Sequence, residues 1–170
     1  MRRICLAFLF CFGLVSAYSQ LPTREEVKWS MSRVADWQVA HLDPKKYGAL
    51  NWVNATFYLG LSRWAGLAER TDSDSGYYDW LVKLCKDNGW KLGRRVYHAD
   101  DICVGQTYLQ LYDRYGDKSV LIPTLERADW VIANPPRGSF DLDYSKPQTL
   151  DHWTWCDALF MAPNVYLGLG

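Results

Sequence analysis

The sequence predicts an all-α fold. Six segments of about ten to twenty residues place apolar side chains at helical spacing, and no stretch alternates apolar and polar residues as a strand would. Glycine, proline and short polar runs separate these segments, as turns between neighbouring helices do. Helical hairpins of this kind suit a toroid in which inner and outer helices alternate.

The first two predicted helices have well-defined starts. A capping box at residues 23–26, T-R-E-E, opens the first helix, which we expect to end near His41. Residues 43–49 are expected to form a loop. The second helix, residues 51–68, is apolar almost all round, so it should be buried on most sides.

The next two helices are predicted from apolar spacing and from their flanking residues. The third covers residues 77–88, with Gly89 as its expected C-terminal cap. The fourth covers residues 98–112, with one of its two aspartates as the expected N-cap. Gly105 inside that helix would cost about 1 kcal/mol relative to alanine. We therefore expect it to allow another helix or a ligand to approach closely.

The last part of the chain contains two further predicted helices and a long loop between them. Residues 119–133 form the fifth helix, which tolerates Pro123 because this residue lies in the first turn. Residues 137–149 show no clear period, and loops of that length in compact domains are often functional. The sixth helix is expected over residues 157–169.

The composition excludes several classes of function. The chain of 170 residues carries 19 basic and 19 acidic side chains. Aromatic residues make up 15% of the chain and include nine tryptophans and eleven tyrosines. Such a chain is too aromatic to be disordered and too uncharged for a typical nucleic-acid binder. It contains no glycine-rich phosphate loop and no basic run, whereas its aromatic residues suit a large core or a sugar-binding cleft.

The N-terminus is typical of a signal peptide, which we place at residues 1–19. Arg2 and Arg3 precede an apolar stretch, residues 4–15, that is too short to serve as a membrane anchor. Small residues around Ala17 provide a cleavage site. We therefore expect an exported protein, periplasmic or secreted, without a membrane anchor.

Three cysteines follow that leader, namely Cys85, Cys103 and Cys156. One disulfide with one free thiol is an option in an oxidising compartment, and a nucleophile pair of Cys156 with His152 is another. No spacing among the three resembles a zinc site. We favour three buried thiols that serve as small core residues.

Residues 151–163, D-H-W-T-W-C-D-A-L-F-M-A-P, have the clearest chemical character. The helix-forming run after Asp157 places this carboxylate at or just inside a helix start, with Trp153 and Trp155 upstream. Indole faces beside a carboxylate are typical of a carbohydrate site, where a sugar ring stacks on the indole and the carboxylate acts as acid or base. An N-cap aspartate with two core tryptophans would give the same pattern without any chemistry.

Two segments resemble the unsaturated rhamnogalacturonyl hydrolases, relatives of the unsaturated glucuronyl hydrolases. The run W-T-W-C-D-A-L-F-M-A-P at residues 153–163 is similar to the signature of that family. The run H-A-D-D-I-C-V-G-Q-T-Y-L-Q-L-Y at residues 98–112 is similar to the segment with its other active-site aspartate. The resemblance starts near residue 23 and implies an (α/α)6 barrel, a six-hairpin toroid of which residues 20–170 would supply about the first half.

The resemblance also implies a site. Asp157 would be the catalytic carboxylate and Asp101 or Asp100 the second one. We favour Asp101 because Gly105 shares its predicted helix face with two tyrosines. The candidate substrate-binding residues flank these carboxylates or lie on the second helix: Trp153, Trp155, His152, Met161, Trp52 and Asn54. Neither a metal nor an organic cofactor is implied.

The implied substrate is a pectin-derived oligosaccharide whose terminal uronic acid, a galacturonyl group, has a double bond between C4 and C5. Asp157 would protonate C4 and then activate water for attack at C5. The alternatives are another helical-barrel enzyme, such as a lyase or a glucuronyl hydrolase, or a non-catalytic sugar-binding module. Because the chain ends inside a predicted apolar helix, we expect a fragment that is inactive or poorly soluble alone and lacks the C-terminal half of the barrel.

Overall fold

The computed structural model describes residues 21–71 and 76–170, and the expected signal peptide lies outside this part of the chain. Within these residues every regular element is a helix, which confirms the all-α prediction. The elements follow in this order: α1 (Arg24–His41), α2 (Pro44–Tyr47), α3 (Trp52–Glu69), α4 (Tyr77–Asp87), α5 (Ala99–Ile102), α6 (Gly105–Tyr115), η1 (Lys118–Leu121), α7 (Ile122–Ala133), η2 (Pro147–His152), α8 (Ala158–Met161) and α9 (Pro163–Leu169).

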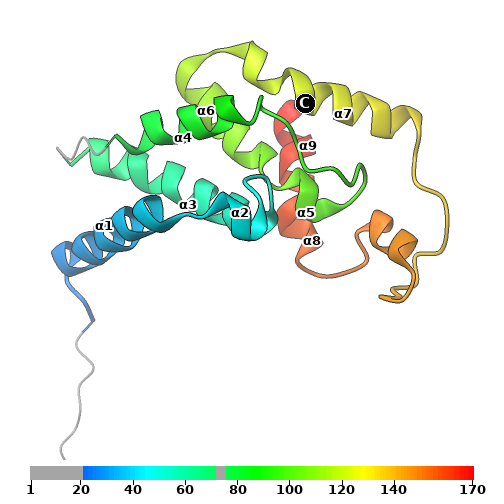
Figure 1. Ribbon diagram of the computed structural model, residues 1–170, viewed down its shortest axis with the longest axis horizontal. Coiled ribbons are helices and arrows are strands. Elements are labelled where there is room, and N and C mark those ends of the chain that lie inside the picture. Colours follow the sequence, from blue (N-terminus) through cyan, green and yellow to red (C-terminus); the bar gives the residue numbers. More distant parts are fainter. Residues whose placement is uncertain (1–20, 72–75) are drawn as a thin grey trace, which may run out of the picture.

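The helices surround one apolar core. α3 packs against α4 and α6, and α6 in turn packs against α9. Figure 1 shows α1, α3 and α4 on one side of the molecule and α7, α8 and α9 on the other, with α6 between α3 and α9 and α5 beside α8. Tyr58, Leu81, Tyr108 and Val165 are fully buried where these helices meet. None of the helices in the described part of the chain combines the length and apolar character that a membrane crossing needs.

The predicted starts of the early helices are confirmed. At α1, the Thr23 hydroxyl accepts a hydrogen bond from the Glu26 backbone at 3.2 Å, and the Glu26 carboxylate accepts one from the Thr23 backbone at 2.7 Å. The prediction that residues 43–49 form only a loop is wrong, because α2 lies within them. Asp43 starts that turn by accepting a hydrogen bond from the Lys45 backbone at 2.9 Å.

Three of the predicted helices are divided in the structure. Residues 98–112 form α5 and α6, joined by short-range bonds such as Gln106 N–H to the Cys103 carbonyl at 3.1 Å. Pro163 divides the last predicted helix into α8 and α9, because proline lacks an N–H and crowds the preceding turn. The fifth predicted helix begins instead as η1, whose first turn Asp117 caps, and continues as α7.

α6 and α9 approach each other through two glycines. A Cβ atom on Gly105 would lie 2.8 Å from Cγ1 of Val165, and one on Gly168 would lie 2.6 Å from Cδ1 of Leu109. On each helix a glycine leaves space for an apolar side chain of the other helix. Because the contacts advance along both helices together, from Gly105 with Val165 to Leu109 with Gly168, the two helices run in the same direction. Gly105 is the first residue of α6, and its close neighbour is a helix, one of the two partners expected from the sequence.

Substituting glycine on α6 should have the opposite effect from the same substitution on α3. Gly105→Ala places a methyl group against the buried Val165, so we expect the free energy of unfolding to fall by about 1–3 kcal/mol. Gly60→Ala, inside α3 with no atom within 4 Å of the new Cβ, should raise it by roughly 0.5–1 kcal/mol. Urea unfolding of both variants measures the difference, and equal effects would contradict the close approach of α6 and α9.

Candidate active site

Two acidic segments from distant parts of the sequence meet at one place. Asp100 lies on α5, Asp157 lies at the start of α8, and α5 packs directly against α8. The Asp157 carbonyl accepts the first hydrogen bonds of α8, from Phe160 at 2.9 Å and Met161 at 3.2 Å, while its carboxylate is exposed. The structure therefore brings the predicted catalytic aspartate to the start of a short helix, as the sequence indicated.

The Asp100 carboxyl group is partly buried at this junction, with 17% of its side chain exposed. Burial raises the pKa of Asp100 above its ordinary value, and the negative charges of Asp157 and Asp101 add to that rise. His98 and Arg95 oppose it by favouring the ionised form. Asp157 is thus close enough to Asp100 for the two charges to interact.

Asp101 has a different set of partners. Its Oδ1 accepts hydrogen bonds from Nε and Nη2 of Arg95 at 3.1 and 2.6 Å, and its Oδ2 accepts one from the Arg95 backbone at 2.7 Å. Its backbone carbonyl also accepts a bond from Gly93 at 2.7 Å, so both ends of the residue hold the turn at residues 93–97. The turn passes so close that a Cβ on Gly93 would lie 2.5 Å from Cγ of Asp101.

The argument that favoured Asp101 over Asp100 does not hold in the structure. It relied on one continuous helix face, but the helix is divided between Ile102 and Gly105. Neither aspartate caps α5, because the N-cap position belongs to His98, which makes no side-chain cap bond there. Asp101 is engaged with Arg95, and Asp100 is the carboxylate that interacts with Asp157.

The two candidate tryptophans differ in what they contact. The Trp155 ring lies against the buried His98 ring, with centroids 4.9 Å apart at 48°, and it is half-buried beside the carboxylates. Trp153 stacks on Tyr166 at 5.7 Å and 14°, and its Nε1 donates a hydrogen bond to the Tyr97 carbonyl at 2.7 Å. Trp153 therefore anchors the segment to α9, and Trp155 is the indole that remains beside the acidic pair.

The other candidate binding residues differ in how far they are exposed to solvent. Met161 is only 4% exposed and packs in the apolar core, so its predicted contact with substrate stays a prediction. Asn54 is buried and donates a hydrogen bond to the Gly48 carbonyl at 2.8 Å, a structural role. Trp52 is 39% exposed at the first turn of α3. His152, on η2, packs against Phe140 with ring centroids 4.5 Å apart.

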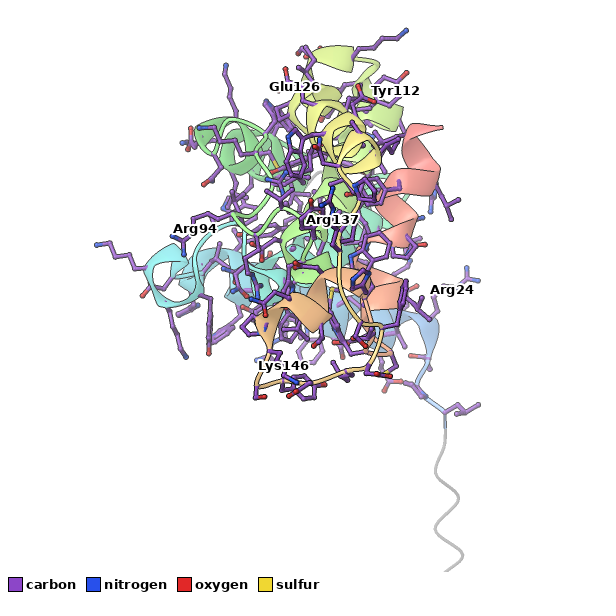
Figure 2. The ribbon with its side chains drawn as sticks, turned by 90° about the vertical axis from the view of Figure 1, so that its right-hand side faces the viewer. Arg24, Arg94, Tyr112, Glu126, Arg137 and Lys146 are labelled. Atoms are coloured by element: carbon purple, nitrogen blue, oxygen red, sulfur yellow. The ribbon has the colours of Figure 1, made fainter. Side chains whose placement is uncertain are left out.

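The long loop after α7 leads to this site. It descends from Arg137 past Lys146 to η2, as Figure 2 shows, and then delivers the chain to Trp153. All three cysteines that follow the expected leader are free. The prediction of buried thiols is right for Cys85 and Cys103 but wrong for Cys156, which is exposed beside Asp157.

Sequence reasoning missed Gln106. Its Nε2 donates hydrogen bonds to the carbonyls of Phe160 at 2.7 Å and Met161 at 3.3 Å, which joins the start of α6 to the end of α8. Gln106 is 7% exposed, and buried polar side chains are rarely left without partners. A glutamine on the apolar face of a predicted helix was the available signal for this link.

One protein-family model matches nearly all of the described part of the chain. The model of the family described as Glycosyl Hydrolase Family 88 matches residues 23–170. The chain belongs to this family. Its members are six-hairpin helical toroids, which confirms the predicted fold class for the family 88 chain.

Two curated relatives share the name unsaturated 3S-rhamnoglycuronyl hydrolase. The protein of Alteromonas sp. (strain LOR) is 33% identical over 153 residues, covering 78% of this chain and 36% of the relative. The protein of Formosa agariphila is 31% identical over 148 residues, covering 82% of this chain and 36% of the relative. The family 88 chain thus matches little more than a third of the length of either relative.

The adjacent aspartates should respond oppositely to the same substitution. Asp101→Asn weakens the charged hydrogen bonds to Arg95, so we expect the free energy of unfolding at pH 7 to fall by about 1–3 kcal/mol. A raised Asp100 pKa means that the ionised form is disfavoured in the folded state, so stability falls as pH rises through the titration of this carboxyl. Asp100→Asn removes that fall and should leave stability at pH 7 unchanged or higher.

Urea unfolding at pH 7 and at about pH 3 measures both effects. The advantage of Asp100→Asn should shrink at the lower pH, where the wild-type carboxyl is protonated in both states. A loss of stability in Asp100→Asn as large as that in Asp101→Asn would contradict the assigned roles.

Proposed function

We propose that this chain is part of a glycosidase that removes a terminal 4,5-unsaturated uronic acid from an oligosaccharide. The observation that carries the proposal is the meeting of Asp157 with the partly buried Asp100, beside the half-buried indole of Trp155. Paired carboxylates beside an aromatic face can bind a sugar ring and move a proton on it. Membership of a glycosyl hydrolase family supports the same reaction class.

In the proposed reaction, protonated Asp157 donates its proton to C4 of the double bond, and positive charge develops at C5 and the ring oxygen. The ionised carboxylate then takes a proton from water as the water oxygen bonds to C5. The resulting hemiketal opens and releases the partner sugar. This chemistry does not occur at the anomeric carbon, so the separation of the carboxylates does not predict its stereochemistry.

Asp100 is the second carboxylate in this proposal. Burial raises the pKa of the Asp100 carboxyl, and the nearby negative charge of Asp157 adds to that rise. Asp100 is supported by Arg95, whose Nη2 lies 3.6 Å from its Oδ2, and Arg95 is in turn held by Asp101. Asp101 would then act through Arg95 rather than on the substrate.

The names of the two curated relatives support the proposed substrate class. Both are named for an unsaturated rhamnoglycuronyl substrate, which supports a terminal unsaturated uronic acid linked to rhamnose. An unsaturated galacturonyl-rhamnose disaccharide derived from pectin is the first substrate to test, and its glucuronyl counterpart is the comparison. We also propose that the protein is exported, on the basis of the leader-like residues 1–19.

Substituting Asp157 separates an enzyme from a sugar-binding module. Asp157→Asn removes the proton donor, so we expect turnover of the unsaturated disaccharide to fall by about 10²–10⁴-fold while binding persists. Cys156→Ser, at the neighbouring exposed position, is the matched control and should retain turnover. The ultraviolet absorbance of the conjugated alkene follows the reaction, and calorimetry follows binding.

The assay is run on the 170-residue chain and on the complete product of its gene. Decay of the absorbance supports hydration of the double bond, whereas growth of absorbance from a saturated polysaccharide would indicate a lyase. If Cys156→Ser abolishes turnover and Asp157→Asn does not, the proposed assignment of the proton donor fails.

A further inference from the structure

His98 occupies an unusual place beside the acidic pair. It is 6% exposed, its ring packs against Trp155, and its backbone is held by hydrogen bonds to Arg95 and Asp101. Its Nδ1 is buried and finds no hydrogen-bond partner among the described residues. The nearest carboxylate oxygen is Oδ2 of Asp100, at 3.7 Å. A buried ring nitrogen without a partner requires an explanation, and here it faces one of the two carboxylates.

We propose that His98 is a positioning residue whose imidazole holds the Asp100 side chain on the side that faces Asp157. The proposal rests on the proposed function, and it adds a residue that neither the resemblance nor the candidate list assigned. A shift of the two side chains from 3.7 Å to about 2.9 Å would form the hydrogen bond from Nδ1–H to Oδ2. Trp155 packs against the imidazole at a tilt of 48°, with ring centroids 4.9 Å apart, and this contact restricts the movement of the ring.

The charge state of His98 suits this role. Burial lowers the pKa of His98, and the positive charge of Arg95 lowers it further, whereas Asp100, Asp101 and Asp151 act in the opposite direction. A neutral imidazole carries one N–H and one acceptor nitrogen, so it can donate a hydrogen bond without adding a positive charge. A neutral donor can therefore position Asp100 without placing another positive charge beside it.

Hydrogen bonds hold the charged side chain of Arg95 in place beside His98 and Asp100. Arg95 is tied to Asp101 through three hydrogen bonds, so its guanidinium stays 3.6 Å from Asp100. Asp151 acts on His98 only through its charge and is the smallest of the five influences on the pKa of His98. The Arg95 hydrogen bonds that hold the 93–97 turn are accepted by Asp101, so a substitution of Asp100 can remove its contact with His98 and leave those bonds in place.

The first test follows the imidazole directly and needs no turnover. The chain contains three histidines, so their titrations can be separated by nuclear magnetic resonance with labelled histidine. We expect His98 to titrate below its ordinary value of 6.5. Asp100→Asn removes a charge that favours the protonated ring, so it should lower that midpoint further. Asp151→Asn makes the same change in charge at a less influential position and should lower it less.

An equal response to Asp100→Asn and Asp151→Asn, or a His98 midpoint above 6.5, would overturn the proposal. The wild-type chain, with His98 in place, provides the reference in each case. Because this measurement does not use substrate, it decides the His98–Asp100 contact even if the chain turns over no unsaturated sugar. Failure of turnover in the complete gene product would instead remove the proposed function.

The second test asks which nitrogen of His98 matters. An asparagine amide nitrogen can take the place of Nδ1, and a glutamine amide nitrogen the place of Nε2. We expect His98→Asn to keep a larger share of turnover than His98→Gln, with an unshifted pH profile. If glutamine restores turnover as well as asparagine does, the ring serves only as packing against Trp155, and the positioning role fails.

Discussion

The close approach of α6 and α9 is the constraint on which the candidate site depends. Gly105 receives Val165 and Gly168 receives Leu109, so the two helices come closer than larger residues would allow. That approach brings the start of α6 to the end of α8, where the Gln106 amide bonds to two backbone carbonyls. α8 then has one position relative to α5, and Asp157 is carried to Asp100. The arrangement of the candidate site therefore depends on two glycines and a buried amide.

Two adjacent aspartates show how the backbone divides similar residues between different tasks. Asp101 directs both carboxylate oxygens to Arg95 and its own carbonyl to Gly93, and this fixes the turn before α5. Asp100 points into the junction with α8, where burial raises its pKa and Arg95 and His98 moderate the rise. Asp101 stabilises the turn, and Asp100 before it lies at the junction with α8, since successive helical side chains point in different directions.

Local patterns allowed part of this arrangement to be predicted from the sequence. The capping box at Thr23, the cap at Gly89 and the helix start at Asp157 depend on neighbouring residues, and all three are present. The division of residues 98–112, the pairing of Arg95 with Asp101 and the left-handed backbone of Trp153, at φ 56°, depend on tertiary contacts. Trp153 is an example. Its position in the sequence predicted an indole that stacks on a sugar ring, but in the structure this indole stacks on Tyr166 and donates a hydrogen bond to the Tyr97 carbonyl.

The separation of the two acidic segments along the chain has a consequence for synthesis. Helices α3 and α4 are neighbours in sequence and can pair early, whereas the Gln106 bonds to Phe160 and Met161 close loops of 54 and 55 residues. Contacts between distant residues form late, because the chain must first lose the entropy of the loop. The helices around Asp100 can therefore pack first, and Asp100 stays accessible to water until α8, which follows Asp157, packs against α5.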